Sequence, residues 1–212
     1  MDTESLLFPV GHFQGLFHEA GVAEPSRYLV GLGDTVADLG QPGFLAWAAA
    51  HGAPPGVPDR HPGRKRILEA VEGGGFEDPE TVVDSLFDVG ALAEIDRSTP
   101  ASTVAFAGRH RVLPLLAGLG NDPAEPGEFR IGLPGRPALG GLPHPVYQLW
   151  ASAHRADHLW AACLRDARSY AEGKHGDPWW RDPEALLSRF TDTLPELLAA
   201  NACYLDFVEE TR

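Results

Sequence analysis

The alternation of apolar and polar residues along 28–39 predicts a pair of strands. This run is apolar at its start, breaks at a Gly33-Asp34 turn, and alternates apolar with polar residues afterwards. Alternation on both sides of a glycine-containing turn is typical of a β-hairpin. The apolar segment 13–17, which lies upstream, can supply a third strand beside it.

Helical spacing replaces the alternation after the hairpin. A helix is predicted from residue 41, because Pro42 suits its first turn and Trp47 and His51 lie one turn apart on one face. Asp78 followed by Pro79 has the pattern of a helix N-cap and first position. The elements predicted here are helices over 41–51, 64–72 and 78–89, a Pro/Gly-rich loop over 53–62, and a short strand over 91–95.

Parts of the chain recur at an offset that grows from 101 to 104 residues. The segments 23–32, 44–51 and 78–80 return in the same order as 124–133, 147–154 and 182–184. Trp47 and His51 therefore correspond to Trp150 and His154. We expect an internally duplicated α+β protein, in which two winged-helix-like units over 1–100 and 101–212 each have a β-hairpin followed by three helices. Units of about a hundred residues are only marginally stable alone, so the two should be packed together.

The second unit differs from the first in its proline and helix patterns. Pro134 and Pro137 are expected to disrupt the turn and the partner strand, since proline cannot donate to a β-ladder. The first helix of this unit is expected to extend over 146–170. Pro195 should kink or divide the third helix. The second unit is therefore predicted to be the more helical one.

The order of hairpin, three helices and closing strand is a winged-helix arrangement with the sheet first. The 28–39 hairpin followed directly by a helix, and the 78–95 helix with its Gly-Ala-Leu-Ala-Glu-Ile ending, resemble the PqqD-like RiPP recognition elements. These modules bind leader peptides of ribosomally made natural products. The resemblance implies that a peptide adds as a strand to the sheet edge and lies against the third helix. The residues to which it assigns binding are Tyr28, Leu29, Val30, Val83 and Phe87.

The charge balance bears on possible partners. Against 30 Asp and Glu the chain has 17 Lys and Arg, which gives a net charge of −13. Sixteen of the acids and six of the bases fall in the first hundred residues, for a net charge of −10 there. Such a surface repels phosphate backbones and anionic lipids, which disfavours nucleic acid and membrane as partners.

Cysteine usage and the N-terminal sequence predict a cytoplasmic protein. Two cysteines in 212 residues fit a reducing compartment better than a disulfide framework. The acidic N-terminus lacks the pattern of a signal peptide, and no apolar run approaches the ~18 residues of a membrane span.

The histidines and tryptophans are the main chemical candidates. His154 and His158 lie four residues apart, which is a metal-ligand spacing on a helix, but no glutamate lies beside the first histidine as in a zincin. We therefore expect no metal and no cofactor, and regard these two residues as weak catalytic candidates for proton transfer. The pairs Trp47/His51 and Trp150/His154 either meet in a structural interface or line a binding pocket.

Three functions remain open on the sequence alone. The first is a non-catalytic peptide- or protein-binding accessory, in lanthipeptide-type natural-product biosynthesis, acting as a monomer or homodimer. The second is a transcriptional regulator with paired winged helices, and the third is an enzyme that uses the His154/His158 region.

The charge pattern yields a prediction about DNA. The first candidate recognition helix has acids and no base, whereas major-groove helices need Arg or Lys. Titration of a labelled duplex at ~0.1 M salt should show only weak binding without sequence preference. Selective nanomolar binding would favour the regulator instead.

Overall fold

The computed structural model describes residues 5–52, 63–173 and 176–208. The loop predicted over 53–62 lies outside these residues. The described chain has a mixed α+β fold, as the sequence pattern predicts.

The described residues of the first half form two small antiparallel sheets and three helices. Its elements are β1 (Ser5–Pro9), β2 (His12–His18), β3 (Pro25–Leu32), β4 (Thr35–Asp38), α1 (Gly40–Ala49), α2 (Arg64–Gly73), α3 (Pro79–Asp88) and β5 (Leu92–Asp96). One sheet has the strand order β2-β3-β4, and the other pairs β1 with β5. The predicted hairpin, its third strand, the helices and the closing strand are confirmed. The sequence pattern did not reveal β1, which is the partner of the closing strand.

The second half repeats this order after one additional helix. Its elements are α4 (Pro100–Ala107), β6 (His110–Pro114), β7 (Ala117–Asp122), β8 (Glu125–Gly132), β9 (Gly140–Pro143), α5 (His144–Ser152), the 3₁₀ turn η1 (Ala153–Arg155), α6 (Leu159–Gly173), η2 (Pro178–Arg181), α7 (Pro183–Ala199) and β10 (Cys203–Phe207). The pairings β7-β8-β9 and β6 with β10 match those of the first half. An origin by duplication stays a prediction.

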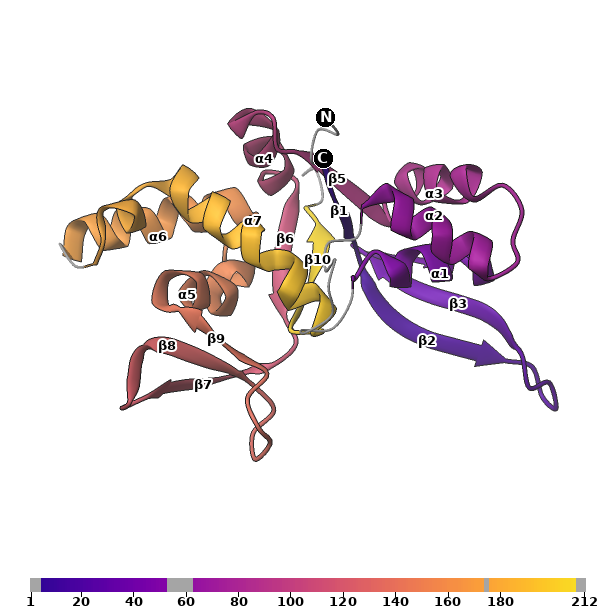
Figure 1. Cartoon of the computed structure of the whole chain (residues 1–212), viewed down its shortest axis with the longest axis horizontal. Helices are drawn as coiled ribbons and strands as arrows, with labels where there is room; N and C mark the ends of the chain where they lie inside the picture. Colours follow the sequence, from indigo (N-terminus) through magenta and orange to yellow (C-terminus); the bar gives the residue numbers. More distant parts are fainter. Residues whose placement is uncertain (1–4, 53–62, 174–175, 209–212) are drawn as a thin grey trace.

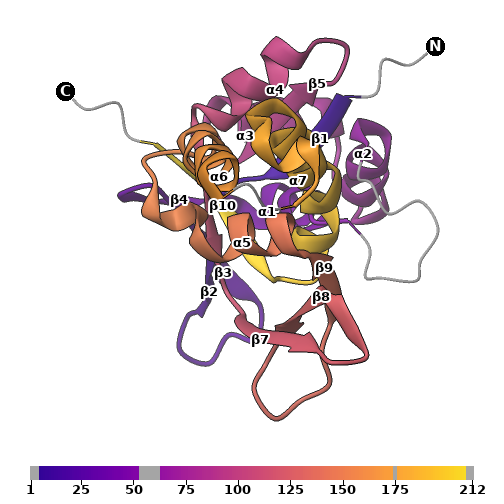
Figure 2. The same ribbon diagram turned by 90° about the vertical axis from the view of Figure 1, so that its left-hand side faces the viewer.

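Figure 1 shows how the halves are arranged. The two-stranded sheets lie in the centre, with α1–α3 and the β2–β3 hairpin on one side and α5–α7 with β7–β9 on the other. In the view of Figure 2 both hairpins lie below the helices, and Figure 1 shows that they diverge to opposite sides.

Two local predictions were wrong, and one alternative of a third is excluded. The partner strand that Pro134 and Pro137 were expected to disrupt is present as β9, which pairs with β8. Both prolines lie in the connection 133–139 between the two strands, so they interrupt neither of them. The helix over 146–170 is broken, because the backbone becomes extended at Ala156 after η1. Pro195 lies inside a continuous α7, so it does not divide this helix.

Asp78 lies at the predicted N-cap position of α3, immediately ahead of Pro79. Its backbone is left-handed, with φ of 57°, and its side chain caps no helix N–H. The carboxylate instead accepts a hydrogen bond from the Thr81 hydroxyl at 3.1 Å.

Each of the two tryptophans connects its helix to the main chain next to a central strand. Trp47 on α1 and Trp150 on α5 are 5% and 1% exposed. The Trp47 indole N–H donates to the Val10 carbonyl at 2.9 Å, and that of Trp150 donates to the Ala202 carbonyl at 3.1 Å. Both acceptors lie where a strand of the central sheets begins or ends.

The halves share one hydrophobic core. The Gly11 N–H donates to the Leu205 carbonyl at 2.7 Å, which joins the start of β2 to β10. The buried Asp206 carboxylate accepts from the Gly33 N–H, also at 2.7 Å. The two units predicted from the sequence are therefore packed into one body.

Both cysteines are buried free thiols. Burial raises the pKa of Cys163 to about 12, so this group is a thiol and not a nucleophilic thiolate near neutral pH. Within the described ranges, no helix is both long and apolar enough to cross a bilayer.

The tryptophan contacts predict large stability losses. Trp47→Ala and Trp150→Ala should each lower the free energy of unfolding by ~3–5 kcal/mol, because each leaves a cavity and an unpaired carbonyl. Trp179, which is half-buried, provides the control: Trp179→Ala should cost much less. Urea denaturation measures the three values, and similar losses at all three positions would contradict this role.

His110 predicts a pH dependence of stability. Burial, followed by the nearby Arg109 charge, lowers the pKa of His110 below 6.5, despite its hydrogen bond to the Phe106 carbonyl. The unfolded imidazole then takes up a proton more readily than the folded one, so stability present above pH 6.5 is lost as the pH falls below it. His110→Asn should reduce this loss in urea denaturation at pH 7.5 and 5.5. The same change at exposed His18 is the control, and an equal effect there would contradict the prediction.

Candidate functional site

The strand to which the sequence assigned peptide capture is not a sheet edge. β3 lies between β2 and β4 and is paired on both sides. Leu29 pairs with Gly15 on one side and with Asp38 on the other, and Val30 is fully buried. The prediction of an open edge over 28–32 is therefore wrong. The reason is that segment 13–17 does form the third strand.

β2 is itself the terminal strand of the β2-β3-β4 sheet. Its first residue is close to β10, where the His12 and Tyr204 rings are 4.9 Å apart. Figure 1 shows the tip of the β2–β3 hairpin projecting beyond the helices. The residues of β2 are exposed at every position except Gly15. A terminal strand presents a row of backbone N–H and C=O groups that can pair with another chain.

Apolar side chains accompany this edge. Phe13, Leu16 and Phe17 are 37%, 42% and 49% exposed, and Val22 in the turn that follows is 48% exposed. The pairing register shifts between Phe13 and Gly15, which is a β-bulge. A bulge increases the local twist and redirects side chains. We define Phe13, Leu16, Phe17 and Val22 as the β2 patch.

An aromatic ladder connects the β2 patch to the core. The Phe13 ring is 5.1 Å from that of Phe44 and 6.4 Å from that of Trp47, and Trp47 is 4.4 Å from His51. The Tyr28 ring also lies 5.2 Å from Phe44. Phe13 is thus the anchored member of the patch, whereas Leu16 and Phe17 lie farther out along the strand.

The predicted Trp/His pairs have different surroundings in the two halves. Each histidine follows its helix by two residues, at equivalent places. His51 packs against Trp47 and has Nδ1 3.1 Å from the Trp47 carbonyl, while burial lowers its pKa. His154 is exposed. Trp47 and Trp150 are both buried, and no ring contact among the described residues joins the Trp47/His51 pair to the Trp150/His154 pair.

Val83 and Phe87, the two residues predicted to bind a peptide from the third helix, do not form a binding surface with the strand over 28–32 either. Val83 is fully buried in the core. Phe87 is half-buried and lines a cavity of about 350 Å³ between α3, β5 and the end of β10.

His154 and His158 are not neighbours on a helix face. His154 lies in η1, and His158 precedes α6, where its Nδ1 accepts the Ala161 N–H at 3.0 Å. That bond gives His158 the role of a helix cap. The sequence suggested that a spacing of four residues puts both histidines on one helix face, but the two lie in different elements. Among the described residues no group of three or more His, Cys, Asp or Glu is arranged to hold a metal.

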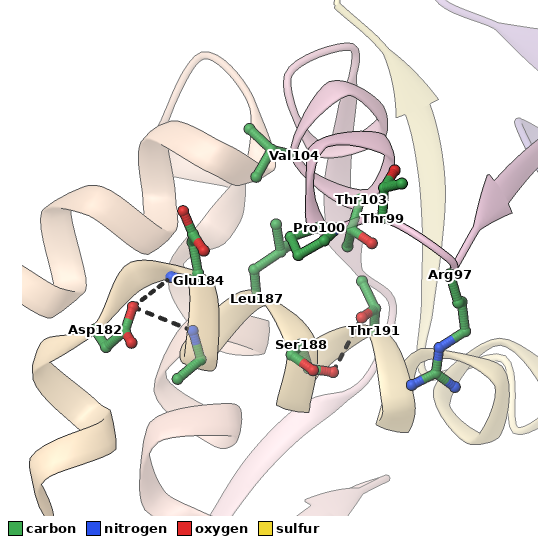
Figure 3. A pocket seen from close by; sticks show the side chains of 11 residues that line it. Arg97, Thr99, Pro100, Thr103, Val104, Asp182, Glu184, Leu187, Ser188 and Thr191 are labelled. Carbon is green, nitrogen blue, oxygen red and sulfur yellow. Dashed lines mark hydrogen bonds between the residues drawn. The ribbon is translucent and has the colours of Figure 1, made fainter.

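A cavity of about 340 Å³ lies between α4 and the first turns of α7 (Figure 3). Its two best-placed charges are engaged within the protein. Asp182 accepts two N–H groups of the first turn of α7, and Arg97 pairs with Asp192. The Thr191 hydroxyl donates to the Ser188 carbonyl. This cavity is thus a weaker candidate than the β2 edge.

Acidic residues surround the tip of the β2–β3 hairpin. Glu19 and Glu24 are exposed there. Arg27 on β3 is paired with Asp38 at 3.2 Å, which offsets its charge. Backbone N–H groups of Tyr28 and Gly40, together with Arg27, lower the pKa of Asp38. This charge distribution suits a partner with Lys or Arg beside its apolar residues.

The sequence-based interpretation missed the β2 patch. The signal was present as three apolar residues in the seven residues of His12–His18, but they do not alternate, because the bulge interrupts the period of two. Comparison of the chain with protein-family models, with curated proteins and with solved structures finds no match.

Proposed function

We propose that this protein is a non-catalytic accessory that binds an extended peptide segment at the β2 edge. The observation that carries the proposal is an exposed terminal strand with Leu16 and Phe17 nearly half exposed. Strand addition uses such an edge for main-chain hydrogen bonds and its side chains for specificity.

The order β2-β3-β4 followed by α1–α3 also supports the resemblance to PqqD-like recognition elements. On this proposal the partner is a leader peptide of a ribosomally made natural product. The binding strand is β2, not β3. The acidic hairpin tip favours a leader segment that has basic residues beside alternating apolar ones.

The proposal predicts that one exposed side chain controls affinity. Phe17→Asp should weaken binding of a fluorescein-labelled 12-residue peptide, with alternating Leu and Thr and a terminal Lys pair, at least tenfold. A charge opposite the apolar peptide is desolvated on binding, and tenfold corresponds to about 1.4 kcal/mol. Fluorescence anisotropy at ~0.15 M salt measures the dissociation constant. The melting temperature should change little, because Phe17 is exposed.

Val36→Asp is the matched control. Val36 is 52% exposed on β4, at the opposite edge of the same sheet, so this change adds the same charge without touching β2. Its dissociation constant should stay within about twofold of the unmodified protein. Bound peptide should also slow amide hydrogen exchange in β2. A larger loss with Val36→Asp, or no slowing in β2, would exclude this edge as the peptide site.

A further inference from the structure

A polar cavity of about 190 Å³ lies between α5 and α6 in the second half. The two helices lie side by side in Figures 1 and 2 and are in contact. Five polar side chains form its lining: His144, Gln148, Asp166, Ser169 and Tyr170. The β2 patch lies in the other half, so this cavity is independent of the proposed peptide site.

Asp166 has one carboxylate oxygen without a partner. Its side chain is only 8% exposed, and Oδ1 accepts from the Arg165 Nε at 2.7 Å. Arg165 is itself held by the carbonyl and the hydroxyl of Ser152, at 3.3 and 2.7 Å. Oδ2 is buried and has no hydrogen-bond partner among the described residues. A buried acceptor left unsatisfied is costly, above all when it is charged, so this oxygen favours a ligand that donates.

Two rings of the cavity lining, those of Tyr170 and His144, contact each other and the Trp180 ring, which is outside the lining. The Tyr170 ring lies 5.2 Å from that of Trp180, and His144 lies 6.0 and 5.7 Å from the two. The Tyr170 hydroxyl is 3.3 Å from His144 Nδ1. Burial, with a smaller contribution from the Asp166 charge, raises the pKa of Tyr170 to about 12, so the phenol stays neutral. Aromatic faces beside a carboxylate attract cations.

We propose that this cavity binds the ammonium group of a small primary amine. An ammonium has three N–H donors, and the lining offers oxygen acceptors on Asp166, Ser169 and Gln148. The Asp166 carboxylate, which Arg165 holds at Oδ1, pairs with the ammonium through its other oxygen, and the Tyr170 ring in the lining covers the adjoining carbon atoms. A ligand with a neutral hydroxyl gains neither the ion pair nor the cation–π contact.

Benzylamine, an ammonium at pH 7, and benzyl alcohol, its neutral counterpart of the same size, test the proposal on the full-length protein. Titration by saturation-transfer NMR at ~0.15 M salt should show saturable binding of the amine and at least tenfold weaker binding of the alcohol. Asp166→Asn should weaken the amine at least tenfold. Glu172→Gln, which removes the same charge from an exposed position on α6, should change the affinity less than twofold.

A second variant separates binding from folding. Asp166→Asn also alters the contact with Arg165, whereas Ser169 is exposed, so Ser169→Leu should narrow the cavity in a protein that stays folded. Loss of amine binding with an unchanged melting temperature supports the site. Equal binding of amine and alcohol, or equal effects of Asp166→Asn and Glu172→Gln, would overturn it.

Discussion

Two buried indole hydrogen bonds position the elements on which the rest of the structure depends. Trp47 and Trp150 each hold a helix against the main chain at the junction of a helical group and a central strand pair. A carbonyl buried beside an apolar helix needs a donor, and the indole supplies it without bringing in water. In the first half this fixes α1 over the β1–β2 junction. The Phe44 ring then meets Phe13, and the direction in which β2 leaves the core is set.

The exposed edge follows from that geometry. β2 starts beside β10, where His12 contacts Tyr204, and continues as one strand of the hairpin with β3. Proteins usually protect a terminal strand with charges, prolines or a covering helix. Here the strand keeps apolar side chains at its outer positions, and the nearest acids lie at the hairpin tip. An edge of this kind favours association with another chain, which is the physical basis of the proposed function.

The two halves have the same order of elements, but their helices differ in length and their surfaces differ in character. The helices α6 and α7 are longer than their counterparts α2 and α3, at 15 and 17 residues against 10 each. The sequence predicted this more helical second half. Asp166 and Tyr170 on α6 lie beside α5, where they line the polar cavity. The apolar edge and the polar cavity therefore belong to separate halves of one body.

Local patterns in the sequence determined the elements themselves. The 28–39 hairpin, the helices near 64–72 and 78–89 and the closing strand follow from periodicity and glycine stops, which act over a few residues.

Tertiary contacts decided the rest. Whether 28–32 is an edge depends on whether 13–17 pairs with it, and the sequence predicts 13–17 as a strand without deciding which strand lies at the edge of the sheet. The spacing of His154 and His158 suggested a helix face, but the backbone turns at Ala156 and His158 caps α6 instead. The cavity around Asp166 could not be read from spacing, because its lining comes from two helices whose contact only the packed core establishes.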